Sequence, residues 1–404
     1  MNHSLTRRSL TLGAALGLVL GSAPATAQKA QHATLAKRIV TTSVNIQPGD
    51  VVVVAGGKHN IDMMEALAVE ATMAGGLVTM FLNSDRVTRT SVAKADPKYL
   101  DLVPTYFANW LEDVDVWIGL PGVEDPKAIF ADVPEDRMAR SGKAAQVIFD
   151  MINDSGLRGT FIAYPSKQEA AENQLDFATL EGMHWKALNA DYQKISAHGA
   201  VLKRMLEGAN EVRVTSPAGT DIQFSVGDRK VFLDDGIVTA EDAKQAMFLT
   251  RWASLPGGAV FTAPLETSAN GQVVVPKTRC RYQPMTGATY EFTNGKVTKF
   301  EAAAGGECYQ ETMAPYTGPK EMFASLQIGL NPGLEVIEEG GDYRPGNAAG
   351  MVWLAIGDNA LLGGANAVGG QGGFGIPVTN ATVEIDGKVV VRNGELTTAV
   401  MAEQ

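Results

Sequence analysis

The feature that most constrains the fold is an alternation of short apolar runs with helical segments in the first half of the chain. The spacing predicts buried strands at Val51–Ala55, Leu77–Leu82, Val114–Leu120 and Arg158–Tyr164. Apolar residues recur at helical spacing in Leu35–Val44, Ile61–Ala74 and Ser141–Asn153. Short buried strands that alternate with helices are typical of a parallel sheet covered on both faces. We therefore predict a doubly wound α/β domain with a mostly parallel sheet.

A different pattern follows the helical stretch Leu175–Asn210. Strands and turns dominate from Glu211 onward, and helices are expected near Thr239–Met247 and Tyr316–Gln327. The expected strands are Glu211–Thr215, Thr220–Val226, Gly258–Thr262, Gln272–Pro276 and Ala381–Val391. The 404 residues also exceed what one core usually organises. We therefore predict an α/β domain over residues 28–205 and a β-rich α+β domain over residues 206–404.

Residues 340–375 are crowded with glycine, in pairs such as Gly363-Gly364, Gly369-Gly370 and Gly372-Gly373. Glycine permits the backbone conformations of a tight turn or of a loop lying against a ligand. A mobile surface loop would have the same composition, so both interpretations stay open. Asp358 and Asn359 follow an apolar strand directly before this loop, where site residues tend to lie.

The first 27 residues are expected to be an export signal rather than part of the fold. Arg7-Arg8 precedes a short apolar run from Leu10 to about Gly21, and Ala25-Thr26-Ala27 offers a cleavage site. The paired arginines favour a twin-arginine signal, with an ordinary secretory signal as the alternative. The apolar run is shorter than the ~20 residues of a membrane span. The mature protein is thus expected to be soluble and periplasmic or secreted.

An oxidising compartment makes Cys280 and Cys308 a candidate disulfide. Two apolar runs between them, joined at Asn294-Gly295, are typical of a β-hairpin. Cysteines that flank the open end of a hairpin can reach each other. Two buried thiols are the alternative.

Charge and histidine content limit the chemistry. The net charge of −11 argues against a general nucleic-acid binder, which needs clustered Lys and Arg. None of the five histidines lies beyond His198. His59, His184 and His198 could serve acid–base chemistry, although helical context favours a buried or solvated role for the last two. Gly56-Gly57-Lys58 lacks the spacing of a phosphate-binding loop.

Several segments together resemble the aminopeptidase T family of metallo-aminopeptidases, which also includes dihydroxypyridine dioxygenases. They are 35–54 with its Gln47-Pro48-Gly49-Asp50 turn, 187–192, 212–221, 255–264, 268–271, 328–332, 354–357 and 383–387. Their order and spacing fit across nearly the whole mature chain. The resemblance implies an N-terminal α/β domain, a β-rich C-terminal domain and a homodimer enclosing a shared cavity.

The resemblance also implies two divalent metal ions held by Glu, His, Tyr and Asp, but each matching position differs here. The residues at these positions are Ala259, Ser325, Trp353, Ala360, Gly373 and Gly375. Hydrolytic transition-metal sites need imidazole, thiolate or carboxylate donors, and Ala, Trp and Gly side chains supply none. We therefore expect the metal site to be absent and predict no cofactor.

Three hypotheses for the function remain. The first is a derivative of the peptidase fold that binds a small molecule or short peptide in the former metal cavity. The second is a metal-independent enzyme in the same cavity, with the candidates Asp358, Asn359, Glu266 and Asp342. The third is an active, leucyl-type metallo-aminopeptidase that releases N-terminal amino acids with ligands from unaligned positions.

Overall fold

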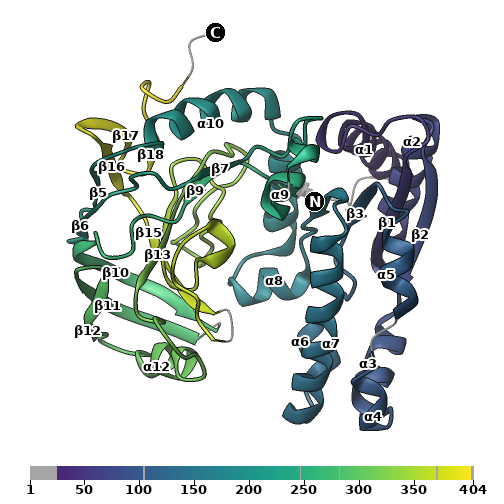
Figure 1. Cartoon of the computed structure of the whole chain (residues 1–404), viewed down its shortest axis with the longest axis horizontal. Helices are drawn as coiled ribbons and strands as arrows, with labels where there is room; N and C mark the ends of the chain where they lie inside the picture. The colour runs from purple at the N-terminus through teal and green to yellow at the C-terminus, as the bar shows by residue number, and fades with distance from the viewer. Residues whose placement is uncertain (1–24, 103–104, 246, 282, 370–371, 402–404) are drawn as a thin grey trace, which may run out of the picture.

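A computed structural model describes residues 25–102, 105–245, 247–281, 283–369 and 372–401. Residues 1–24 of the expected export signal and Gly370 of the glycine-rich segment lie outside these ranges. Figure 1 shows the α/β half at the right and the β-rich half at the left.

The first half is built on a parallel sheet, which confirms the predicted α/β architecture. In the described chain this sheet A has the strand order β2-β1-β3-β4-β8. Its strands are β1 Val51–Gly57, β2 Leu77–Asn83, β3 Val116–Gly119, β4 Arg158–Ile162 and β8 Trp252–Leu255. Each neighbouring pair is parallel. β8 comes from beyond residue 205, so residues on both sides of the expected domain boundary share one sheet.

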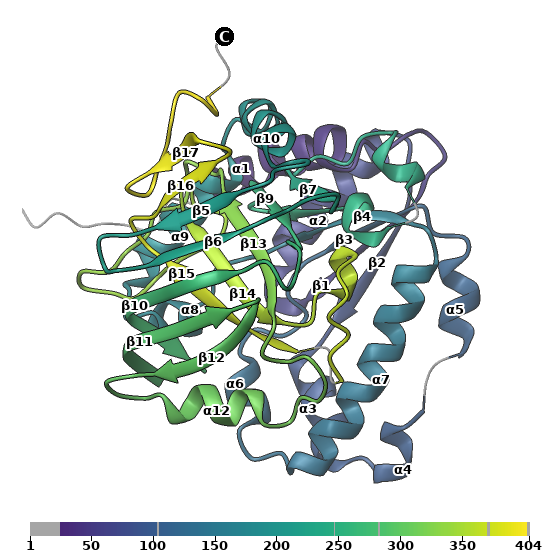
Figure 2. The ribbon, with the colours of Figure 1, turned by 60° about the vertical axis from the view of Figure 1, so that its left-hand side comes forward.

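Helices precede and connect these strands, and the last of them packs against the β-rich half rather than against sheet A (Figures 1 and 2). They are α1 Ala25–Arg38, α2 Ile61–Met73, α3 Asp85–Lys94, α4 Pro97–Leu100, α5 Thr105–Leu111, α6 Pro126–Phe130, α7 Glu135–Asp154, α8 Lys167–Glu172, α9 Phe177–Leu188 and α10 Tyr192–Leu206. A π-helical turn, Ile39–Ser43, continues α1. Residues from α1, α2 and sheet A join one apolar core that extends into the β-rich half.

The second half consists of two antiparallel sheets. In the described chain sheet B has the order β12-β11-β10-β6-β5-β16-β17-β18, and sheet C has the order β15-β14-β13-β9-β7. The strands of sheet B are β5 Val212–Thr215, β6 Asp221–Phe224, β10 Asn270–Cys280, β11 Gln283–Thr293, β12 Lys296–Glu301, β16 Thr382–Ile385, β17 Lys388–Arg392 and β18 Glu395–Leu396. Those of sheet C are β7 Val231–Asp234, β9 Ala259–Thr262, β13 Phe323–Gly329, β14 Val352–Gly357 and β15 Gly373–Val378.

The two antiparallel sheets share a buried apolar layer. Leu326, Leu354 and Ile376 of sheet C belong to the same core as Val214 and Ile222 of sheet B. Side chains alternate between the faces of a strand. One face of sheet C is therefore committed to the core, and the opposite face is available to a site.

Two helices expected in the second half are wrong. Tyr316–Gln327 contains a turn at Gly318, whose φ of +82° ends helical structure, and then becomes strand β13. The described residues of Thr239–Met247 contain a short 3-10 turn, Asp242–Lys244, after which Gln245 is extended. The remaining helices are α11 Phe248–Arg251 and α12 Glu307–Met313.

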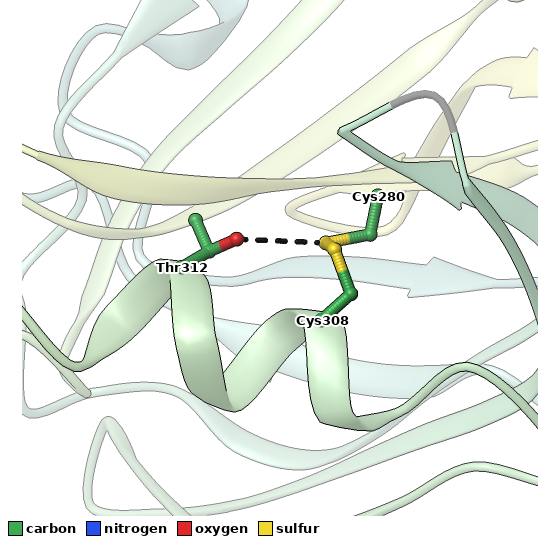
Figure 3. The surroundings of a disulfide bond; sticks show 3 residues. All are labelled: Cys280, Cys308 and Thr312. Carbon is green, nitrogen blue, oxygen red and sulfur yellow. Dashed lines mark hydrogen bonds between the residues drawn. A yellow bond between two sulfur atoms is a disulfide. The ribbon is translucent and has the colours of Figure 1, made fainter. Parts of the chain in front are cut away.

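The expected disulfide joins Cys280 at the end of β10 to Cys308 in α12 (Figure 3). The two residues are 28 positions apart, and the β11–β12 hairpin lies between them. The disulfide therefore closes the open end of that hairpin, as the sequence predicted. Thr312 lies 3.5 Å from the Cys280 sulfur. Within the described ranges, no helix has the length and apolarity needed to cross a bilayer.

Candidate functional site

Several of the positions at which the resemblance implies metal ligands lie on one face of sheet C. Ser325 of β13 and Gly375 of β15 both pair with Ala355 of β14, so all three face the same side. Trp353 lies two residues from Ala355 and shares that face. The core layer occupies the opposite face, so this one is the site face. Ala360 lies beyond β14 in an exposed 3-10 turn, Ala360–Leu362.

The side chains at these positions do not fit two divalent metal ions. Ala259, Trp353 and the two glycines offer no donor atom, which leaves the hydroxyl of Ser325. Across the described ranges, no three His, Cys, Asp or Glu side chains gather closely enough to hold a metal ion. The residues of this face therefore do not fit a metal-dependent reaction.

The indole of Trp353 lies close to two glycines. A Cβ atom on Gly375 would lie 2.8 Å from the Trp353 ring, and one on Gly346 would lie 3.3 Å from it. Since real Cβ atoms almost never come that close, glycine at 375 gives the ring room. The indole nitrogen of Trp353 is buried, yet it has no hydrogen-bond partner in the described structure.

A pocket of about 440 Å³ adjoins Trp353, and we call it the arginine pocket. It is lined by Asn173, Thr278, Arg279, Arg281, Asp342, Tyr343, Arg344, Trp353 and Pro377. Asp342 is 4% exposed and forms ion pairs with Arg344 and, at 3.3 Å, with Arg279. Glu338 also pairs with Arg344, at 3.1 Å. The pocket lining thus carries three guanidinium groups and one carboxylate.

Two nitrogen atoms of this pocket lack a well-aligned hydrogen-bond acceptor. The buried Nε of Arg279 lies 3.3 Å from the Asp342 carboxylate without forming a hydrogen bond, and the buried Nε1 of Trp353 has no partner among the described residues. Leaving a buried donor unsatisfied costs about 1–3 kcal/mol. A bound molecule with acceptor oxygens would recover that free energy. The arrangement is therefore suited to holding an anion over an apolar floor of Trp353 and Pro377.

The candidate carboxylates Glu266 and Asp358, with Asn359, form a different cluster beside the glycine-rich loop. Glu266 pairs with Arg229 at 2.6 Å and accepts hydrogen bonds from the Asn359 side chain and the Ala365 N–H. Burial acts to raise the pKa of Glu266, but these donors outweigh it and the pKa is lowered.

The same cluster fixes the path of the loop. Asn359 accepts from the Asn366 N–H at 2.9 Å, and Asp358 accepts from the Val368 N–H at 2.7 Å. Arg229 donates to the Gly363 carbonyl oxygen at 2.7 Å. We call Arg229, Glu266, Asp358 and Asn359 the loop anchor. These contacts explain why the chain carries polar residues here, and a catalytic role for them stays a prediction.

The three candidate histidines belong to elements other than sheet C. His184 is buried beside Tyr343, and burial lowers its pKa to about 4. His198 is partly buried in α10. His59 is exposed and lines a crevice of about 730 Å³ that also contacts Pro121 and Tyr164, at the carboxyl ends of β1, β3 and β4.

The sequence interpretation missed the three arginines of the pocket. Arg279 and Arg281 flank Cys280, whereas Arg344 follows Asp342 by two positions. The Arg-Cys-Arg run beside a candidate disulfide was the available signal, because the disulfide fixes the backbone between the two cations. Only the fold brings the distant residue Arg344 to them.

The sheets define a class: a peptidase-like fold with a parallel α/β half, a two-sheet β-rich half and a site face on sheet C. The family model of the thermophilic metalloproteases (M29) matches residues 28–321, so the chain belongs to that family.

Two solved structures have the same fold. Wild-type AmpT from Thermus thermophilus is 16% identical, with a TM-score of 0.71 over 92% of this chain and 100% of that one. The 2,5-dihydroxypyridine dioxygenase from Pseudomonas putida KT2440 is also 16% identical, with a TM-score of 0.59 over 92% and 98% of the two chains. At this identity the likeness shows the fold alone. No curated protein matches the chain.

Proposed function

We propose that the protein uses the peptidase fold to bind a small organic anion in the arginine pocket, without metal-dependent hydrolysis. The observation that carries this proposal is the buried, unpartnered indole N–H of Trp353, in one pocket with Arg279, whose Nε has an ion pair with Asp342 but no hydrogen bond. Asp342 offsets part of the positive charge, and Arg281 adds an exposed guanidinium at the opening.

The chemistry of the lining favours a carboxylate attached to a flat apolar body. A guanidinium presents N–H donors in a planar fork that matches the two oxygens of a carboxylate. Trp353 and Pro377 provide an apolar surface against which a ring can lie. The proposed ligand class is therefore an aromatic or otherwise apolar organic acid.

Titration calorimetry with benzoate, compared with the neutral benzamide, tests the proposal. We expect the wild type to bind benzoate and to bind benzamide at least about tenfold more weakly, since one good charge-assisted contact is worth about 1.5–3 kcal/mol. Trp353→Phe keeps an aromatic ring but removes the indole N–H donor. It should therefore weaken binding of benzoate and leave binding of benzamide unchanged. Equal affinity for both probes, or no binding of either, would contradict the proposal.

The alternative is an active metallo-aminopeptidase with ligands from other positions, which the family match keeps in view. Elemental analysis of the purified protein separates the two. One or two tightly held transition metals per chain, with Co²⁺- or Zn²⁺-dependent cleavage of chromogenic aminoacyl substrates, would establish the alternative. We expect neither result. Metal-independent turnover that disappears in Asp358→Asn would instead favour an enzyme using the candidate carboxylates.

Export from the cytoplasm is part of the proposal. The arginine pair and the apolar run at the N-terminus support it, and the Cys280–Cys308 disulfide suits an oxidising compartment. Fractionation followed by mass spectrometry should find a mature N-terminus near Gln28 outside the cytoplasm. A full-length cytoplasmic chain would contradict export.

A homodimer is also proposed, and an exposed apolar strip on α2 and β2 supports it. Val69, Met73 and Leu77 are 59%, 80% and 62% exposed, and β2 is an edge strand of sheet A. Light scattering should give twice the chain mass for the wild type and the monomer mass for Met73→Asp. A monomeric wild type would contradict the dimer.

A further inference from the structure

A second pocket, of about 370 Å³, lies where sheet A meets sheet C. Trp252 and Ser254 of β8 and Phe161 of β4 line it from sheet A, while Asp234 of β7 and Phe261 of β9 line it from sheet C. Side chains of α7 and α11 complete the lining. We call it the aromatic pocket, since six of its lining residues are Phe or Trp.

Asp234 is the charged group in the lining of this pocket. Its Oδ1 accepts hydrogen bonds from the Ser254 N–H at 3.2 Å and the Gly236 N–H at 3.3 Å. Asp234 is partly buried, and among the described residues no Lys, Arg or His forms an ion pair with it. Burial raises the pKa of Asp234 to about 6, so the carboxylate is mainly ionised at pH 7.5.

The surrounding rings present π surfaces to the same space. The ring of Phe248 lies 4.9 Å from that of Trp252 and 5.5 Å from that of Phe149. Phe161 is 48% exposed, which leaves part of its ring open to an incoming ligand. An aromatic face attracts a positive charge through its quadrupole, and the attraction grows when water is excluded.

We propose that the aromatic pocket binds an organic cation: an ammonium group on a small apolar body, placed against Asp234 and enclosed by Phe and Trp rings. A carboxylate without a cationic partner, within apolar walls, is complementary to such a ligand and repels an anion. The site is separate from the arginine pocket. Along one cross-strand row of sheet C, Gln327 lies between Phe261, which lines the aromatic pocket, and Trp353, which lines the arginine pocket.

Titration of the full mature protein with benzyltrimethylammonium, compared with neutral neopentylbenzene, tests this site. The wild type should bind the cation and show a change in tryptophan fluorescence, because Trp117 and Trp252 line the pocket. Asp234→Asn should weaken binding about tenfold or more. Phe161→Leu keeps an apolar side chain but removes the π surface. It should therefore weaken binding of the cation several-fold and leave binding of the neutral probe unchanged.

Arg281→Ala is the matched control, since it removes a charge from the other pocket and should not alter binding of the cation. It also separates this site from the proposed anion site, because each proposal can fail alone. No binding of the cation by the wild type would overturn the inference. Equal affinity for the neutral probe, or unchanged affinity in both Asp234→Asn and Phe161→Leu, would overturn it as well.

Discussion

The loop anchor and the arginine pocket both border sheet C, yet they differ in how completely their buried polar atoms are hydrogen-bonded. In the loop anchor, Glu266 and Asn359 have partners for their buried side-chain oxygen and nitrogen atoms. In the arginine pocket, Trp353 Nε1 has none, and Arg279 Nε has an ion pair with Asp342 but no hydrogen bond. A satisfied network holds the backbone in place, whereas unpartnered buried donors indicate where a ligand completes the structure. The first region should therefore control stability and the second should control binding.

The largest expected effect is on the loop anchor. Glu266→Ala leaves Arg229 without its partner in a site that is mostly removed from water. Breaking such a pair should lower the free energy of unfolding by about 3 kcal/mol. Urea denaturation measures the loss. Glu266→Gln, which keeps an acceptor oxygen, should lose less, and benzoate affinity should be unchanged in both variants. A large loss of affinity at full stability would place the anchor in the site.

Acid should lower the stability of the fold through a buried histidine next to the arginine pocket. His184 contacts Tyr343, a lining residue, and burial lowers the pKa of His184 from 6.5 to about 4. Between these values the unfolded chain binds more protons, so the stability from the neutral imidazole is lost as the pH falls, by roughly 2 kcal/mol.

Urea titrations of wild type and His184→Gln at several pH values between 7 and 4 isolate this contribution. The raised pKa of Asp234 acts in the opposite direction, because protonation of that carboxylate favours the folded state. Only the difference between the two proteins therefore reports on His184. We expect the wild type to lose more stability than the variant on acidification. Parallel curves would contradict the prediction.

The arginine pocket should respond in affinity rather than stability. Arg281 is exposed, so Arg281→Ala should change the free energy of unfolding by less than about 0.5 kcal/mol. Loss of its guanidinium should weaken benzoate binding about tenfold, in line with one charge-assisted hydrogen bond. Calorimetry and urea denaturation of the same sample give both numbers. A loss of stability in Arg281→Ala without a loss of benzoate affinity would contradict this prediction.

The smallest effect is expected at Trp353. Trp353→Phe removes a buried donor that has no partner, so the ligand-free protein should be as stable as the wild type or slightly more stable, by up to about 1 kcal/mol. Its thermal stabilisation by benzoate should nevertheless be smaller. A clear loss of stability without ligand would contradict this prediction.

The sequence predicted what depends on local pattern. Buried strands such as Val51–Gly57 and the Cys280–Cys308 pairing follow from apolar spacing and from a hairpin turn. The mistaken helix at Tyr316–Gln327 shows the limit, because the apolar spacing of a short segment fits a helix as well as the strand Phe323–Gly329.

The site depends on contacts between distant segments, and these left little trace in the sequence. Glu266 and Asn359 lie 93 positions apart, so their partnership could not be recognised from the chain alone. The resemblance identified Trp353 and its neighbours as altered positions. It did not reveal that Arg279 and Arg344 approach from other segments to form a pocket beside them.

Strand β8 has a consequence for how the molecule is held together. The chain leaves sheet C after β7, crosses to the edge of sheet A as β8, and returns to sheet C as β9. The two halves are therefore joined by strand pairing within one sheet and not only by side-chain packing. An N-terminal fragment ending at residue 205 would leave one edge of β4 bare, and such edges invite aggregation. Heat or urea should melt both halves in a single cooperative step.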